Sequence, residues 1–382
     1  MGGRSPQLDL LRGIAVLAVM LCHYPCFRWF DSGSAGVDLF FVLSGFLISG
    51  LLFSEWNQSG TITLSRFFVR RGFKIYPSFY FLILTSLPLF LVAPEIGEHP
   101  FRRLAAELLF LQDYLPPIWG HTWSLAVEEQ FYLLLPLLLV LMTKLNPRRP
   151  FAVIPFISVL LVIGCLALRI ARHPAGALDV RFAFHYRADA LFAGVALGYL
   201  FHFRNETFRA ISRWWLLPLT LLALLPQLVY PESAAYAPYV LGCNTVAFAA
   251  LVLWAVTRTN LRVRWIERIG VYSYSIYLWH FLIADAFQRS HPRLILLPFY
   301  IAASIAFGTY MGNIIELRAL RVRDKYFPRR NQSTLGYSDP NSPLLPAGLA
   351  FQSVDEKPPL SQSTGRLSKV MSGAERVQPR SE

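Results

Sequence analysis

The chain has 382 residues, of which 54% are hydrophobic and only 15% are charged, and its net charge at pH 7 is +13. A soluble protein with so few charged residues would expose large apolar patches to water, so the composition excludes an ordinary soluble domain. The positive charge lies in short clusters between apolar runs, which is typical of membrane-protein loops and not of a nucleic-acid-binding face. The predicted partner is therefore the lipid bilayer and not a nucleic acid.

Ten apolar runs approach the length of about 20 residues that a helix needs to cross a bilayer. They lie at 8–26, 36–54, 75–93, 125–143, 151–170, 186–203, 214–230, 236–257, 269–287 and 294–316. A further run at 108–115 is too short and is followed by Pro116 and Pro117, so it is predicted to be interfacial or re-entrant. The sequence therefore predicts an all-α fold, a polytopic membrane helix bundle with about ten transmembrane helices.

Lysine and arginine are concentrated in alternate loops between the apolar runs, at 66–74, 144–149, 204–213, 258–268 and 318–330. Because cytosolic loops carry an excess of these residues, both the N-terminus and the C-terminus are predicted to be cytosolic. Residues 331–382 are rich in Ser, Pro and charge and lack apolar periodicity. They are predicted to form a disordered cytosolic tail after a membrane domain at residues 1–330.

The first apolar run contains two ionisable residues, Arg12 and His23. Eleven residues correspond to about three helical turns, so both side chains project from one face, about 16 Å apart along the axis. Ionisable groups inside a membrane are costly and are therefore candidates for function. The pair predicts a cation near the cytosolic end of this helix and a proton acceptor near its outer end.

Further polar residues lie within or beside the later runs. Four cations gather before the third run: Arg66, Arg70, Arg71 and Lys74. The others considered are Asp38, Ser44, Trp123, Glu128, Glu129, Arg187, Asp189 and His280. Adjacent helical residues point about 100° apart, so at most one of Glu128 and Glu129 is expected to face any given site. Close helix packing remains an alternative role for Ser44-Gly45, and pairing with the backbone remains one for His280.

Six motifs in this order resemble the membrane acyltransferase family that O-acetylates cell-envelope and exported glycans, the acyltransferase-3 family. They are LDLLRGIAVLAVMLCHY at 8–24, GVDLFFVLSGFLI at 36–48, RFFVRRGFKIYP at 66–77, TWSLAVEEQFYLLLPLLL at 122–139, YRADALFAGVALG at 186–198 and GVYSYSIYLWHFLI at 270–283. The resemblance implies acetyl-CoA as donor and a glycan or lipid-linked oligosaccharide as acceptor. It also implies a multi-pass protein of the bacterial inner membrane.

The resemblance also implies roles for individual residues. His23 would be the catalytic histidine, and Glu128 is the carboxylate expected to orient its ring. Arg12, Arg70, Arg71 and Lys74 would lie near the phosphates of the donor. The candidate substrate-binding residues are Asp38, Ser44, Trp123, Arg187, Asp189 and His280. The four cysteines are not spaced as a metal site, and no metal is predicted.

Three positions depart from the family pattern: Leu10 replaces a usual glycine, Lys74 stands where arginine is common, and Glu316-Leu317-Arg318 replaces a frequent Glu-Arg-Pro. The last leaves the role of Glu316 open. A two-step acetyl relay is expected to need a separate partner among envelope-glycan biosynthesis proteins. Two other functions remain open at this point, a transporter of a lipid-linked glycan or small anion and a non-catalytic scaffold of an envelope biosynthesis complex.

Overall fold

The computed structural model describes residues 5–24, 34–92, 99–172, 178–229, 236–258, 261–289 and 293–327. All of them belong to one unit that extends from Arg4 to Asp339. These residues form helices and turns without a strand, which confirms the all-α prediction for this part of the chain. The predicted tail at 331–382 lies outside the described residues.

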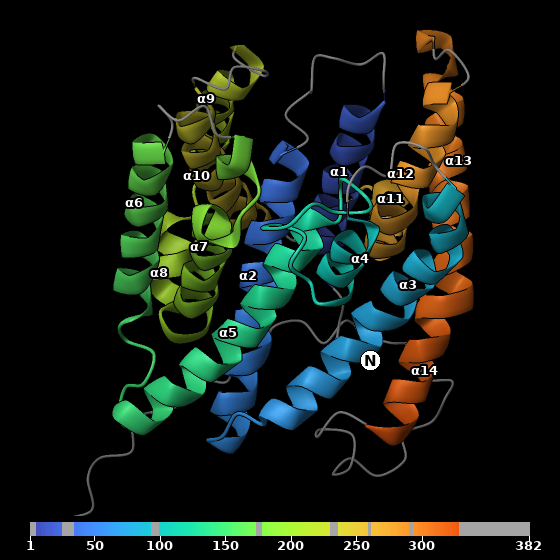
Figure 1. Ribbon diagram of the computed structural model, residues 1–382. Coiled ribbons are helices and arrows are strands. Elements are labelled where there is room, and N and C mark those ends of the chain that lie inside the picture. The colour runs from blue at the N-terminus through green and yellow to red at the C-terminus, as the bar shows by residue number, and fades with distance from the viewer. Residues whose placement is uncertain are drawn as a thin grey trace, which may run out of the picture. The chain divides into compact units, whose positions relative to one another are not determined.

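Figure 1 shows the order and arrangement of the helices. The first half of the chain forms α1 (Pro6–His23), α2 (Ser34–Ser59), α3 (Leu64–Val92), α4 (Pro100–Leu108), α5 (Trp123–Leu145) and α6 (Ile154–Arg172). The second half forms the 3-10 turn η3 (Leu178–Arg181), α7 (Phe184–Phe203), α8 (Asn205–Ile211), α9 (Leu216–Val229), α10 (Ala237–Val256), α11 (Arg264–Val271), α12 (Ser273–Arg289), the 3-10 turn η4 (Leu294–Leu296), α13 (Leu297–Met311), the π-helix η5 (Gly312–Glu316) and α14 (Leu317–Tyr326).

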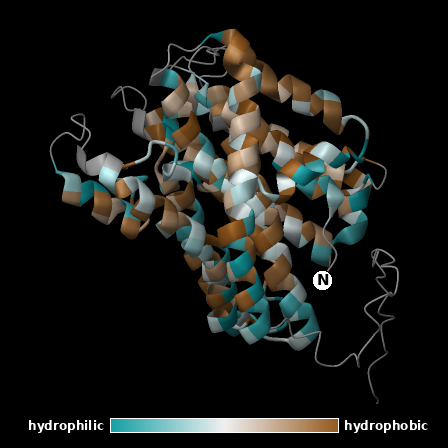
Figure 2. Cartoon of the chain, turned by 90° about the vertical axis from the view of Figure 1, so that its right-hand side faces the viewer, coloured by the Kyte–Doolittle hydropathy of each residue, from teal (hydrophilic) through white to brown (hydrophobic). Residues whose placement is uncertain are grey.

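Each of the ten apolar runs is largely helical in the structure, and the helices are apolar over much of their length (Figure 2). Six helices are long and apolar enough to cross a membrane, and the bent pair α8 and α9, which meet at 72°, would make a seventh span. Helices α9 and α12 have only 14 and 17 residues, short of the length that spans a bilayer alone. The described residues thus form a multi-pass membrane protein, with six or seven spans by this measure where ten were predicted.

Two segments differ in detail from a simple series of spans. The run at 269–287 is divided at Tyr272, which separates α11 from α12. The run at 108–115 leaves the helical conformation after Leu108 and includes Phe110 with a φ of 54°. The buried carboxylate of Glu107 fixes the chain that follows, because it accepts hydrogen bonds from the backbone of Ile118 and from the hydroxyl of Thr122 at 2.9 and 2.8 Å. This segment carries His121 to the start of α5.

Helices α2 and α7 pack together more extensively than any other pair. Their contact depends on two glycines: a Cβ on Gly45 would lie 1.9 Å from the carbonyl oxygen of Leu191, and one on Gly194 would lie 2.1 Å from that of Val42. Small residues allow backbones to approach closely in membrane helices. Helix α1 packs in turn against α2, α11 and α12, so its polar side chains meet residues from both halves of the chain.

Candidate active site

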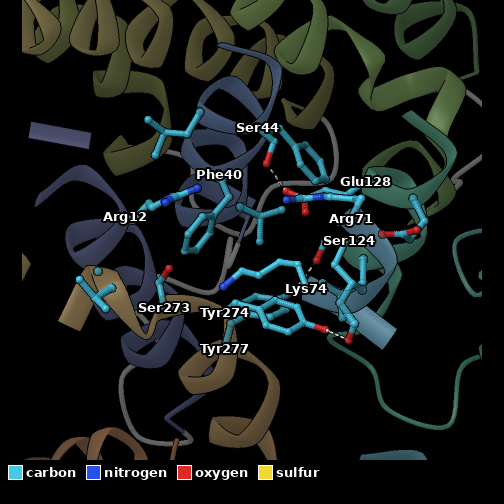
Figure 3. A pocket seen from close by; sticks show the side chains of 18 of the residues that line it. Arg12, Phe40, Ser44, Arg71, Lys74, Ser124, Glu128, Ser273, Tyr274 and Tyr277 are labelled. Carbon is cyan, nitrogen blue, oxygen red and sulfur yellow. Dashed lines mark hydrogen bonds between the residues drawn. The ribbon is translucent and has the colours of Figure 1, made fainter. Parts of the chain in front are cut away.

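A cavity of about 260 Å³ opens where helices from both halves of the chain converge (Figure 3). We call it the cationic cavity. Its walls come from α1, α2, α3, α5, α11, α12 and α14. Its polar lining residues are Arg12, Ser44, Arg71, Lys74, Ser124, Glu128, Glu129, Ser273, Tyr274, Tyr277 and Arg323. The apolar remainder includes Val37, Phe40, Phe41, Leu43 and Ile75.

Four cations line this cavity, and Figure 3 shows Arg12, Arg71 and Lys74 entering it from two different helices. The guanidinium of Arg71 lies 3.9 Å from the ring centroid of Tyr132, which holds it against α5. The ammonium of Lys74 forms an ion pair with Glu316 of η5, and Arg323 joins from α14. Several cations around one small space favour an anionic ligand.

The two adjacent glutamates of α5 both line the cationic cavity. Glu128 accepts hydrogen bonds from the hydroxyls of Ser44 and Tyr132, each at 2.7 Å, and Glu129 accepts one from Tyr76 at 3.2 Å. The expectation that at most one of the two would face a site is therefore wrong. The cavity extends far enough around α5 that both adjacent side chains reach it, although they leave the helix in different directions.

A second polar group, which we call the histidine cluster, consists of His23, His121 and His280. The ring centroid of His280 lies 5.0 Å from that of His23 and 5.4 Å from that of His121. Phe281 packs against the edge of His23 at 5.1 Å and stacks on His121 at 4.7 Å. His121 and His280 are buried, whereas His23 is only partly buried.

The expected pairing of Glu128 with His23 is not found. Nδ1 of His23 lies 3.1 Å from Nε2 of His280 and 3.0 Å from the carbonyl oxygen of Val19, whereas Glu128 is bonded to Ser44 and Tyr132. The reason is the depth of Glu128, which lies five residues into α5, about 8 Å along the axis from the end that carries His121. His280 of α12 occupies the place beside His23 that was predicted for the carboxylate.

Tyr277 connects the two polar groups. It lines the cationic cavity, and its ring centroid lies 5.6 Å from that of His280 and 5.5 Å from that of His121. Its hydroxyl donates to the carbonyl of His121 at 2.6 Å and accepts from Ser124 at 2.6 Å, because a carbonyl can only accept. The side chain of Tyr277 thus contacts both the cationic cavity and the histidine cluster.

The comparison with known proteins decides the family, because the model described as "Acyltransferase domain" matches residues 5–314. The chain belongs to this acyltransferase family. It is similar to the peptidoglycan O-acetyltransferase OatA of Listeria monocytogenes, with 28% identity over 345 residues, 81% of this chain and 55% of that protein. It is also similar to the O-acetyltransferase OatA of Staphylococcus aureus, with 30% identity over 312 residues, 73% of this chain and 50% of that one.

The acyltransferase therefore spans only about half the length of these two relatives. No solved structure matches the chain. Family membership favours an acyltransferase among the three functions that the sequence left open, and both relatives are named as O-acetyltransferases. The names of these relatives assign no residue of the site.

The structure brings most of the predicted donor residues of the acyltransferase together, but not Arg70. Arg12, Arg71 and Lys74 line the cationic cavity. The guanidinium of Arg70 instead pairs with Asp324 of α14 at 3.2 Å and donates to the carbonyl oxygen of Phe327. Successive residues of α3 point about 100° apart, so neighbouring arginines of one motif reach different surroundings.

Four predicted substrate-binding residues of the acyltransferase lie in a buried network and not in the cavity. They are Asp38, Trp123, Arg187 and Asp189. Arg187 pairs with Asp38, and Asp189 pairs at 2.7 Å with Arg169, which was not predicted; the side chains of these two ion pairs are at most 2% exposed. The guanidinium of Arg187 also lies 5.5 Å from the ring of Trp123. These contacts join α2, α5, α6 and α7, which is a structural role. Ser44, in contrast, does line the cavity.

The sequence interpretation missed several residues of the site, among them His121, Tyr277 and Arg323. His121 directly precedes the fourth motif, and its position beside that motif is the signal that could have found it. Tyr277 precedes His280 by one helical turn, so its place on the same face was available from spacing. Arg323 lay in a basic stretch that was explained by topology alone, and nothing in the sequence separates it from its basic neighbours.

Proposed function

We propose that this acyltransferase transfers an acetyl group from acetyl-CoA, bound at the cationic cavity, to a glycan hydroxyl that is activated by His23 in the histidine cluster. The observation that supports it is the arrangement of α1. Arg12 lines the cavity, and His23 lies about 16 Å further along the same helix. Tyr277 touches both polar groups, so the two lie next to each other.

The donor site is proposed from charge and size. Acetyl-CoA carries several phosphate charges, and Arg12, Arg71, Lys74 and Arg323 provide charge-assisted hydrogen bonds for them. The volume of about 260 Å³ is slightly below the range of about 300–1,000 Å³ that is usual for small-molecule sites. It therefore suits the thin pantetheine arm and its phosphates, with the adenosine outside the cavity.

The proposed reaction is a direct acyl transfer. A sugar hydroxyl is a weak nucleophile, and a neutral imidazole accepts its proton as the oxygen attacks the thioester carbonyl. The new C–O bond forms at the acetyl carbon, the C–S bond breaks, and the thiolate of CoA receives the proton from the His23 imidazolium. Glu128, which faces the cavity, belongs in this proposal to the donor side and not to the proton transfer.

The acceptor and the location are proposed from the relatives and the charge pattern. A relative is named a peptidoglycan O-acetyltransferase, so we propose a cell-envelope glycan as acceptor and the bacterial cytoplasmic membrane as location. We propose that both ends of the membrane domain lie in the cytosol, so that the basic loops and the cationic cavity face the CoA pool. The histidine cluster then lies nearer the outer face, where envelope-glycan biosynthesis proteins would present the glycan acceptor.

The test is replacement of His23 by Ala in cells whose glycan acetylation depends on this chain. We expect glycan-bound acetyl, measured by mass spectrometry after mild base release, to fall to the level of a deletion strain. Membrane abundance of the variant is measured in parallel. His202→Ala is the matched control, because His202 of α7 packs against Phe53 of α2 and lies in neither polar group. Unchanged acetyl content in the His23 variant would refute the proposal.

A further inference from the structure

The hydrogen bonds of the histidine cluster determine where its protons lie. Nδ1 of His280 lies 2.5 Å from the carbonyl oxygen of Tyr277. A carbonyl oxygen only accepts, so this nitrogen carries the hydrogen. In a neutral imidazole the other nitrogen, Nε2, is then an acceptor. Nε2 of His280 lies 3.1 Å from Nδ1 of His23, so the hydrogen between them belongs to His23.

The surroundings of His23 agree with this assignment. Its Nδ1 also lies 3.0 Å from the carbonyl oxygen of Val19, another group that can only accept. The opposite arrangement would place a hydrogen on both nitrogens of His280 and make it a cation. His280 is fully buried, and no carboxylate of the described residues bonds to its ring, so a charge there is disfavoured. In that opposite arrangement, Nδ1 of His23 would also point its lone pair at the carbonyl oxygen of Val19, and two acceptors would face each other.

We infer that His280 is the positioning residue that fixes His23 in the Nδ1–H tautomer and so gives Nε2 of His23 the proton-accepting lone pair. This inference rests on the proposed role of His23 as general base. In serine hydrolases a carboxylate holds the catalytic histidine in the corresponding tautomer. Here a second imidazole, itself oriented by the Tyr277 carbonyl, replaces that carboxylate.

The carbonyl of Val19 cannot hold the tautomer as well by itself. In an α-helix the carbonyl of residue i−4 already accepts the backbone N–H of residue i, and Val19 stands in this relation to His23. Of these two acceptors, Nε2 of His280 is the one that is not shared with a backbone N–H. Phe281 packs on the edge of the His23 ring at 5.1 Å and limits its rotation, but it offers no acceptor.

The experiment compares His280→Leu, which removes the acceptor, with His280→Gln, whose side-chain oxygen can accept from Nδ1 of His23. The full chain is purified in detergent with ¹⁵N-histidine, and the His23 nitrogens are assigned by their loss in His23→Ala. Acetyl transfer is followed as CoA release from acetyl-CoA with peptidoglycan fragments as acceptor. His202→Leu serves as the control for replacing a histidine elsewhere in the helices.

We expect His280→Leu to shift the Nδ1 resonance of His23 toward that of an unprotonated nitrogen and to lower kcat at least about tenfold, with little change in KM for acetyl-CoA. His280→Gln is expected to recover most of both quantities. If His280→Leu leaves the nitrogen shifts and kcat unchanged while His23→Ala is inactive, the positioning role is wrong and the general-base proposal stands. If His23→Ala retains the wild-type kcat, the proposed function is wrong and the inference is overturned with it.

Discussion

Lys74 of α3 and Glu316 of η5 form an ion pair beside the cationic cavity, which links α3 to the C-terminal helices. Glu316 is 3% exposed and also accepts a hydrogen bond from Ser275 at 2.6 Å. It ends the π-helix, a rare conformation that occurs frequently at functional sites. The carboxylate whose role the sequence left open thus binds a cation that lines the cavity.

The first prediction concerns this pair. Glu316→Leu leaves the Lys74 charge without its carboxylate, and we expect it to lower the free energy of unfolding by about 1–3 kcal/mol, less than for a fully buried pair because Lys74 is 26% exposed. The double variant Lys74→Met with Glu316→Leu removes both charges and should be more stable than Glu316→Leu alone. Thermal unfolding in detergent measures the stability of each variant. A loss of stability in the double variant equal to the sum of the losses in the two single variants would contradict the pairing.

The second prediction separates two adjacent arginines. Arg71→Ala and Arg12→Ala each remove a cation from the cationic cavity and should weaken acetyl-CoA binding about 10- to 100-fold, the range for a charge-assisted hydrogen bond. Arg70→Ala is the matched control, because Arg70 pairs with Asp324 and is absent from the cavity lining. Its effect should be less than about threefold. Isothermal titration calorimetry with acetyl-CoA measures these affinities. Equal losses of affinity in Arg70→Ala and Arg71→Ala would show that the donor binds elsewhere.

The third prediction tests the crossing of α2 and α7. Gly45→Ala places a Cβ 1.9 Å from the carbonyl oxygen of Leu191, so the helices must separate, and overpacking of this kind costs about 1–3 kcal/mol. Gly164→Ala on α6 is the control, because a Cβ there meets no atom within 4 Å. That change should be neutral or stabilise the helix by about 0.5–1 kcal/mol. Comparable melting temperatures for the two variants would contradict the close approach.

The fourth prediction concerns the buried network. Asp189→Leu leaves the fully buried guanidinium of Arg169 without its carboxylate and should cost about 3–5 kcal/mol of stability. Arg169→Met in the same chain removes that unpaired charge and should restore much of the loss. Arg172→Met, at the exposed end of α6, should change stability by less than about 0.5 kcal/mol. Chemical denaturation monitored by circular dichroism gives all three values.

The amino-acid sequence determined the helices and the shared face of α1. Apolar runs of bilayer length exclude strands, and the eleven-residue spacing of Arg12 and His23 places both on one side of one helix whatever surrounds it. The family motifs indicated the candidate site residues. These properties depend only on local geometry and on the free energy of burying apolar side chains, so they can be read along the chain.

The partners of those residues were decided by the tertiary structure alone. Glu128 was expected beside His23, but it bonds to Ser44, while His280 reaches His23 from a helix more than 250 residues later in the chain. Periodicity gives the direction of a side chain relative to its own helix, whereas the neighbour on that side depends on how the helices pack and at what depth they cross. For the same reason only the assembled helices could distinguish Arg70 from Arg71, which are adjacent in one motif but have different surroundings.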